Sequence, residues 1–188
     1  MVVTLPAYSG LVAKELTTER LTLRPWHLDD AETALGVYGD ASIARWLSPA
    51  MDTVADLGAM RLVLQHWIGE DERLVPPAGR WAIERRDDGR VIGGAVLLPL
   101  PPGGDDLEMG WHLHRDVWGK GYAVEAGQRL ARWAFDEGLD EVFAVTRPAN
   151  DRAGAVARHI GMDWVGETEK YYGLRLQVFR MRPADLEG

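Results

Sequence analysis

The chain has 188 residues, of which 46% are hydrophobic and 27% charged, a balance typical of one globular domain with a substantial core. Its 29 acidic and 21 basic residues give a formal net charge of −8. General nucleic-acid binding needs an excess of basic charge, so that class of function is not expected.

The chain contains no cysteine, which excludes disulfides, thiolate metal sites and covalent intermediates on a thiol. Its only serines are Ser9, Ser42 and Ser48, and none lies in a Gly-x-Ser-x-Gly setting. If the chain transfers acyl groups, we therefore expect the acceptor to attack the acyl donor directly.

The N-terminus has no basic leader before an apolar run, so no signal peptide is expected. The longest apolar stretch, residues 91–102, is interrupted by glycine and proline and is shorter than the roughly 20 residues that a membrane helix needs. We expect a cytoplasmic protein with no membrane partner. It should form one domain over residues 1–188, with a loosely attached lead-in over residues 1–16.

The first predicted elements are one strand and two helices. Polar and apolar residues alternate over residues 20–24, which predicts a strand with one buried face. Helix start signals, in which an acid follows an acidic or hydroxyl residue by three positions, occur at Asp29 and again at Thr53. We expect helices over residues 29–38 and 53–69.

The middle of the chain predicts a hairpin and a third strand. Two apolar runs, residues 81–83 and 91–98, flank the step Asp88-Gly89, where glycine accepts the positive φ of a tight turn. After a loop over residues 99–106, a further strand is expected over residues 107–114.

The clearest helix is predicted over residues 121–137, where an apolar stripe recurs at helical spacing and Gly138 follows as a C-terminal cap. A strand, a short helix with Asn150 as N-cap and a closing antiparallel pair follow over residues 141–146, 150–159, 164–167 and 171–181. This order predicts an α+β (mixed α/β) fold, with a mostly antiparallel sheet of about seven strands and four helices on its faces.

The strand-to-helix junction carries Gly119 and Gly121. Two glycines remove the Cβ atoms that would keep a ligand away from the backbone. The first-turn N–H groups of the following helix have no partner within it, and the helix dipole favours an anion there. A diphosphate is the natural occupant. The junction matches neither a P-loop nor the dinucleotide fingerprint.

Glu108-Met-Gly-Trp111 and Trp118-Gly-Lys-Gly-Tyr-Ala-Val-Glu125 together resemble motif A of GNAT acetyltransferases. More narrowly, they resemble the RimJ/RimL-like branch, whose named members acetylate N-terminal amines of ribosomal proteins. Three further segments are similar to that branch in the same order, so that the resemblance runs from about residue 18 to 182: residues 18–25, 148–162 and 171–181.

The resemblance implies a GNAT fold that binds acetyl-CoA as the acyl donor, with no metal. It implies that the backbone from Trp118 to Ala123 holds the CoA pyrophosphate, that the strand end near Trp111 to Leu113 pairs with the pantetheine arm, and that Asn150 contacts the arm. The cofactor-binding candidates are Trp111, Leu113, Arg115, Trp118, Gly119, Lys120, Gly121, Tyr122, Ala123, Asn150 and Arg158, with Arg152 as a further basic residue near the phosphates.

Three positions depart from the family pattern. Asp116 stands where the family often has Gln or Arg, so we expect its carboxylate to point away from the phosphates. Ala153 replaces a frequent serine. The tyrosine that often protonates the leaving thiolate would fall on Ala157.

The acceptor amine must be neutral to attack. At pH 7, deprotonation costs about 4.6 kcal/mol for a lysine side chain and only about 1.1 kcal/mol for an α-amino group. Glu108 is our first candidate for the base, and His112 and then His114 on the same strand face follow it. Tyr172 is a candidate proton donor or pocket residue. The alternative for each is an ordinary structural role in its strand.

The aromatic residues divide into two groups. Trp81 and Trp133 are expected in the core, whereas Trp26, Trp46 and Trp67 fit either the core or the acceptor pocket. No metal site is predicted, because the histidines lack paired-ligand spacing apart from the weak pair His112-x-His114.

The leading hypothesis is an N-acetyltransferase that acts on a protein N-terminus. The alternatives are the same chemistry on a small amine, such as a polyamine, amino acid or antibiotic, a non-catalytic acyl-CoA-binding module, and a scaffold protein. A homodimer is an expectation from the family alone.

Overall fold

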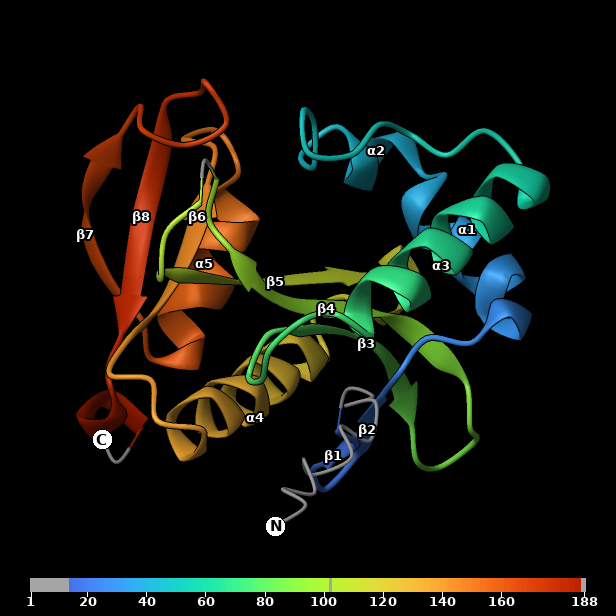
Figure 1. The fold of residues 1–188 in the computed structure, drawn as a ribbon, viewed down its shortest axis with the longest axis horizontal. Coiled ribbons are helices and arrows are strands. Elements are labelled where there is room, and N and C mark those ends of the chain that lie inside the picture. Colours follow the sequence, from blue (N-terminus) through green and yellow to red (C-terminus); the bar gives the residue numbers. More distant parts are fainter. Residues whose placement is uncertain (1–13, 102, 187–188) are drawn as a thin grey trace, which may run out of the picture.

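The computed structural model describes residues 14–101 and 103–186, which form one eight-stranded sheet in the order β1-β2-β3-β4-β5-β6-β8-β7 with helices on both faces (Figure 1). The strands are β1 (Leu16–Thr17), β2 (Leu21–Arg24), β3 (Gly79–Arg85), β4 (Val91–Pro99), β5 (Leu107–Leu113), β6 (Val142–Thr146), β7 (Asp163–Thr168) and β8 (Leu176–Met181). The helices are α1 (Ala31–Tyr38), α2 (Ala41–Ala44), α3 (Leu57–Asp71), α4 (Tyr122–Asp136) and α5 (Asp151–Ile160).

The predicted α+β class and the mostly antiparallel sheet are confirmed, and the sheet has one strand more than expected. The extra strand is β1, in which Leu16 pairs with Leu23 of β2 and is fully buried. The end of the predicted lead-in is therefore part of the core rather than loosely attached. Residues 1–13 of that lead-in lie outside the described residues.

The early helices are confirmed, but their caps differ from the prediction. The chain enters α1 through a 3-10 turn, Leu28–Asp30, and the Asp30 carboxylate accepts a hydrogen bond from the His27 amide at 2.8 Å. The helix α3 begins after Asp56, whose side chain accepts from the Ala59 amide at 2.8 Å, and it runs two residues past Gly69. The four-residue helix α2 had no sequence signal.

The hairpin between β3 and β4 is confirmed, with Gly89 at φ +69° in its turn. The last strand is shorter than predicted. Residues 171–175 do not extend β8, because Tyr172 at φ +56° and Gly173 at φ +65° turn the chain before Leu176. This left-handed backbone conformation is uncommon for a residue other than glycine.

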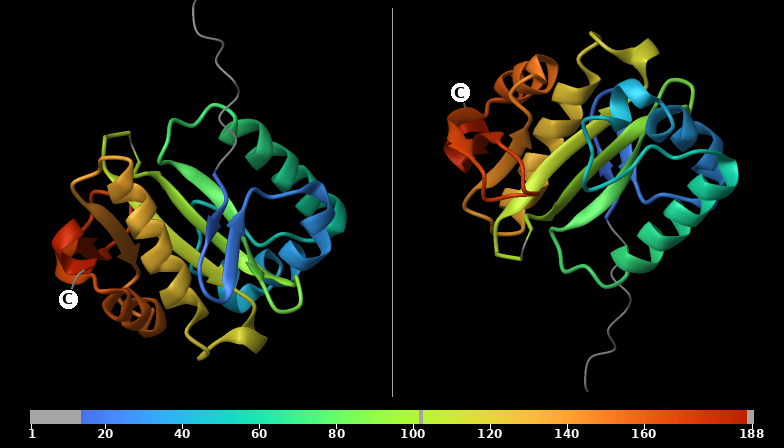
Figure 2. Two further views of the ribbon diagram at one scale, coloured as in Figure 1. Left: turned by 90° about the horizontal axis from the view of Figure 1, so that it is seen from below. Right: turned by 90° about the horizontal axis from the view of Figure 1, so that it is seen from above.

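Two hydrophobic cores lie between the sheet and its helices. Figure 2 shows helices on both sides of the sheet. On one face, α4 and α5 pack on the strands. Trp133 is buried there, and its indole N–H donates to the Pro77 carbonyl at 3.1 Å. On the other face, α1 and α3 pack around Trp26 and Tyr38. Trp81, Trp133 and Trp26 are thus core residues.

The strands β5 and β6 form the parallel pair of the sheet. Among the described residues, Glu108 and Phe143 are the one registered pair between them, and past this point the strands separate. Figure 1 shows β6 and β8 running at a steep angle to β5. The sheet is therefore split into a V whose apex lies at Glu108.

Candidate active site

A cleft of about 1020 Å³ opens where β5 and β6 separate. Its walls come from both strands, from the first turns of α5, from the segment around α2 and from α3. Volumes of this order hold ligands of drug size or larger. A second groove runs from the same opening past the N-terminus of α4, and Leu113, Trp118 and Ala123 line both.

The predicted anion site lies at the N-terminus of α4. Gly119 and Gly121 have φ values of +75° and +80°, and Gly121 is the N-cap of the helix. No side chain caps this helix end. A Cβ added to Gly119 would meet no described atom within 4 Å, so the space in front of the loop is open. The first-turn amides are therefore available to a phosphate.

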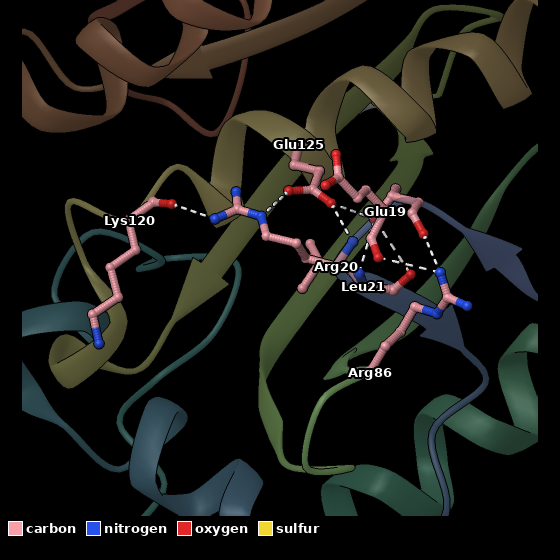
Figure 3. A network of polar contacts seen from close by, with 7 residues as sticks. Glu19, Arg20, Leu21, Arg86, Lys120 and Glu125 are labelled. Carbon is pink, nitrogen blue, oxygen red and sulfur yellow. Dashed lines mark hydrogen bonds and ion pairs between the residues drawn. The ribbon is translucent and has the colours of Figure 1, made fainter.

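Arg20 contacts residues at both ends of this loop, Lys120 and Glu125 (Figure 3). Its Nε donates to the Glu125 carboxylate at 2.6 Å, and its Nη1 donates to the Lys120 carbonyl at 2.9 Å. Its guanidinium also lies 4.5 Å from the centre of the Tyr122 ring. The Thr18 hydroxyl donates to the same carboxylate at 2.6 Å. The turn between β1 and β2 thereby fixes both ends of the loop.

The basic candidates are placed differently from one another. The guanidinium groups of Arg115 and Arg152 lie 5.7 and 3.7 Å from the centre of the Trp118 ring, beside the loop, and both residues line the cleft. Lys120 is exposed and lines neither groove. Arg158 does not face the cleft either, because its guanidinium lies over the Phe179 ring. Of the two arginines of α5 that were predicted near the phosphates, Arg152 faces the cleft and Arg158 does not.

Asp116 points away from the loop, as predicted. Its carboxylate pairs with Arg90 of the β3–β4 hairpin at 2.8 Å, and this contact holds the pKa of Asp116 below its usual range. The charge of Asp116 is thus neutralised by Arg90 of the hairpin.

The residues that were predicted to contact the pantetheine arm line the walls of the V. Trp111 and Leu113 of β5 line the cleft opposite β6. Asn150 lines it from α5, where its side-chain oxygen accepts from the Ala153 amide at 3.2 Å as the N-cap. Ala157 has no hydroxyl and is fully buried, so that position supplies no proton donor to the cleft.

Glu108 and Tyr172 meet at the apex of the V. The Tyr172 hydroxyl donates to Oε2 of Glu108 at 2.6 Å, and both residues line the cleft. Burial raises the pKa of Glu108 to about 7, although the hydrogen bond from Tyr172 acts in the opposite direction. Burial and the nearby carboxylate both raise the pKa of Tyr172, so the phenol stays protonated. A carboxyl group near neutrality exchanges protons readily at physiological pH.

The histidines of β5 have different surroundings. Nδ1 of His112 lies 3.2 Å from the Tyr38 hydroxyl, and burial lowers the pKa of His112 to about 4, so the ring is neutral at pH 7. His114 bonds to the Thr33 carbonyl at 2.9 Å and lies against Gly36, where an added Cβ would come within 2.3 Å of the ring. His114 therefore anchors α1 and is no longer a candidate base.

Trp46 and Trp67, which the sequence left open between the core and the acceptor pocket, both line the cleft. Trp67 of α3 packs edge-on against Tyr38, with ring centres 5.2 Å apart, and Trp46 lies on the segment after α2. Sequence reasoning missed Tyr38, which faces the sheet, and Arg147, which follows β6. Neither residue lies in a recognisable motif.

The described part of the chain contains no cluster of three or more metal-ligating side chains. It also contains no helix that is long and apolar enough to cross a membrane.

Comparison with known proteins decides the family. Residues 20–163 match the acetyltransferase (GNAT) domain family. The chain is a GNAT acetyltransferase. Among its relatives is the uncharacterized N-acetyltransferase p20 of Bacillus licheniformis, 30% identical over 136 residues, which cover 72% of this chain and 74% of that protein.

Solved structures share the GNAT fold. One is the microcin C7 self-immunity acetyltransferase MccE in complex with acetyl-CoA and AMP, with a TM-score of 0.72 and 16% identity over 88% of this chain and 93% of that one. Another is a Vibrio cholerae protein described as a putative ribosomal-protein-serine acetyltransferase, with a TM-score of 0.70 and 18% identity over 90% of this chain and 98% of that one.

This GNAT chain is an acetyl-CoA-dependent N-acetyltransferase, and its own residues fit the donor. The open loop at Gly119 and the uncapped end of α4 lie where the prediction puts the CoA pyrophosphate, and β5 and β6 separate where it puts the pantetheine arm. The loop lines the second groove and Glu108 lines the cleft, and the two share Leu113, Trp118 and Ala123.

Proposed function

We propose that this GNAT enzyme acetylates the α-amine of a protein N-terminus, in the manner of the RimJ/RimL-like branch that its motifs resemble, by direct attack in a ternary complex. The observation that carries the proposal is the hydrogen-bonded pair of Glu108 and Tyr172 at the apex of the cleft, with a Glu108 pKa of about 7.

The pKa of Glu108 fits an α-amine better than a lysine side chain. Proton transfer from an α-ammonium group near pKa 7.8 to this carboxylate costs about 1.1 kcal/mol, whereas transfer from a lysine near pKa 10.4 costs about 4.6 kcal/mol. Glu108 is therefore the base in our proposal, and His112 is not, because its lowered pKa makes it a weak proton acceptor.

An α-ammonium acceptor loses two protons in the reaction. Glu108 takes the first before the attack and releases it to solvent, which leaves a neutral amine. The amine nitrogen bonds to the thioester carbonyl carbon, and the carbon–sulfur bond then breaks to release the CoA thiolate. Glu108 takes the second proton from the amine nitrogen, and Tyr172 gives its hydroxyl proton to the thiolate. Glu108 then returns the proton to the Tyr172 phenolate. Tyr172 thus supplies the hydroxyl that the family pattern would place at Ala157.

The charge of the cleft supports a peptide over polyamines and aminoglycosides, the cationic small-molecule alternatives. Its lining contains five arginines but only two carboxylates, Glu108 and Asp151. Polycations would be repelled by such a surface. Cytoplasmic location and a homodimer remain predictions.

Release of CoA from acetyl-CoA, measured against N-terminal peptides, polyamines and aminoglycosides, tests the proposal. We expect peptides with a free α-amine to accelerate release and the same peptides with a blocked N-terminus but an internal lysine to be inert. Faster release with polyamines or aminoglycosides than with any free peptide would reject the peptide assignment. Binding of acetyl-CoA without release under any amine would indicate a binding module.

A further inference from the structure

The cleft has the opposite charge to the chain as a whole. The sequence carries a net charge of −8, yet the cleft is lined by Arg45, Arg80, Arg115, Arg147 and Arg152. Arg80 is neutralised by Glu70 and Asp71, at 2.9 and 2.6 Å. Within the described ranges, the other four arginines form no ion pair. Four unpaired cations in one cleft of an acidic protein indicate anionic ligands.

Two of these arginines belong to the donor end. Arg115 and Arg152 flank the ring of Trp118, next to Gly119 and the amides of α4. Phosphates bound at the loop would account for both charges. They do not account for the two arginines at the opposite wall.

Arg45 and Arg147 meet at the short segment 45–48, which Arg45 begins and which the Arg147 side chain contacts. Arg147 follows β6 and crosses to this segment, where its Nη2 donates to the Ser48 carbonyl. Arg45 lies over the ring of Trp46, at 4.5 Å from its centre. Neither residue lines the groove beside the α4 loop.

This wall also holds polar atoms that lack partners. In the described part of the protein, Nε of Arg147 and the hydroxyl oxygen of Thr146 are the buried side-chain polar atoms without a hydrogen bond, and both residues line the cleft. A buried polar group that lacks a hydrogen bond destabilises the protein. A carboxylate accepts hydrogen bonds from a guanidinium and a hydroxyl together, so it would satisfy both.

The distance between this wall and Glu108 determines how long an acceptor must be to contact both. Thr146 lies three residues along β6 from Phe143, the partner of Glu108, and a strand rises ~3.3 Å per residue, so the wall is about 10 Å from the base. An extended peptide advances ~3.3–3.6 Å per residue. An acidic side chain at the second or third residue spans this distance, whereas the carboxylate of a free amino acid lies too close to its own amine.

We propose that Arg147, with Thr146 and Arg45, forms an anion subsite that selects peptide N-termini carrying Asp or Glu at the second or third residue. This inference rests on the proposed function and adds the charge of the acceptor to it.

The test uses three peptides that differ only at residues two and three, which are Glu-Glu, Gln-Gln or Lys-Lys, and free glutamate as a fourth acceptor. We expect kcat/KM for CoA release to be at least tenfold higher for the Glu-Glu peptide than for the Gln-Gln peptide, and lowest for Lys-Lys. Added salt should raise KM for the Glu-Glu peptide alone.

Substitutions of Arg147 and Arg45 test whether these residues cause the preference for the acidic peptide. Arg147→Gln, and independently Arg45→Gln, should reduce the Glu-Glu rate towards the Gln-Gln rate and leave the Gln-Gln peptide and the Kd for CoA unchanged. Arg61→Gln removes an exposed charge of α3 that lines neither groove, and it is the matched control.

Three outcomes would overturn the inference: equal rates for the Glu-Glu and Gln-Gln peptides, an equal loss on both in the two variants, or a faster rate with free glutamate than with the Glu-Glu peptide. In each of them a Gln-Gln peptide that still accelerates CoA release leaves the proposed function intact. Failure of all three peptides to accelerate release rejects both.

Discussion

Arg20 and Glu125 are separated by 105 positions in the chain and form a bidentate contact, in which both the backbone amide and the Nε of Arg20 donate to the two carboxylate oxygens, at 2.9 and 2.6 Å. The same guanidinium donates to the Lys120 carbonyl, so Arg20 links the β1–β2 turn to the loop that contains Gly119 and Gly121. A surface ion pair contributes little to stability, about 0–1 kcal/mol. Its effect should instead appear in donor binding.

Arg20→Lys keeps the charge but not the planar fork that serves three contacts at once. We expect the Kd for CoA to rise about threefold to tenfold, measured by calorimetry, because the loop must be ordered on binding. Thermal unfolding should change little. Arg86→Lys is the matched control, since Arg86 binds the carbonyls of Thr18 and Glu19 in the same turn without touching the loop. Equal weakening in both variants would contradict the positioning role.

Glu108→Gln removes the proposed base while keeping a similar shape. General acid–base catalysis contributes about 10²–10⁴-fold, so kcat should fall within that range. The wild-type kcat/KM should rise with pH through about 7, where Glu108 loses its proton, and through the pKa of the acceptor amine, and then level off. In the variant the limb near pH 7 should vanish, and the limb that belongs to the acceptor amine should remain. A pH profile identical to that of the wild type would exclude Glu108 as the base.

The free energy of unfolding should also depend on the pKa of Glu108. The folded-state pKa of about 7 exceeds the ordinary value of 4.5, so between these pH values the folded state binds more protons than the unfolded state. The free energy of unfolding therefore falls as pH rises through this window, by about 3 kcal/mol at most. Urea titrations at pH 4.5 and 7.5 should show this loss in the wild type relative to Glu108→Gln. The same pH dependence in both proteins would show that Glu108 titrates normally.

The conformation of the loop before α4 could be predicted because it depends on residues that are neighbours in the sequence. Gly119 and Gly121 precede a strongly amphipathic helix, and the positive φ values they needed are present. The choice between Arg152 and Arg158 could not be made in this way. These residues lie six positions apart on α5, about 240° around the helix axis, so only the docking of α5 decides which one faces the cleft.

Long-range pairs were likewise out of reach of sequence patterns. Tyr172 was predicted within a strand, because nothing marks a tyrosine for the left-handed conformation that it adopts. That turn lets its hydroxyl reach Glu108, 64 positions away. The hydrogen bond from Arg147 to the Ser48 carbonyl could not be predicted either, because the two residues are 99 positions apart in the sequence.

Tyr172→Phe separates two effects of one hydroxyl. The hydrogen bond from Tyr172 lowers the pKa of Glu108, so its loss should move the pH limb of kcat/KM upward from 7. Hydrogen bonds to charged groups contribute about 1.5–3 kcal/mol, which corresponds to a displacement of about one to two pH units. If Tyr172 also protonates the thiolate, kcat on the plateau should fall. A lower plateau with an unmoved limb would contradict the coupling to Glu108.

Gly119→Ala tests the phosphate loop itself against a control of equal strain. Gly119 and Gly89 have φ values of +75° and +69°, and an added Cβ meets no described atom within 4 Å at either position. Alanine at φ > 0 should therefore destabilise both variants by a similar amount, about 1–2 kcal/mol. At Gly119 the methyl group also enters the space in front of the amides of α4, so the Kd for CoA should rise at least tenfold in that variant alone. Unfolding curves and CoA calorimetry on both proteins check this, and equal CoA affinity at equal loss of stability would place the diphosphate elsewhere.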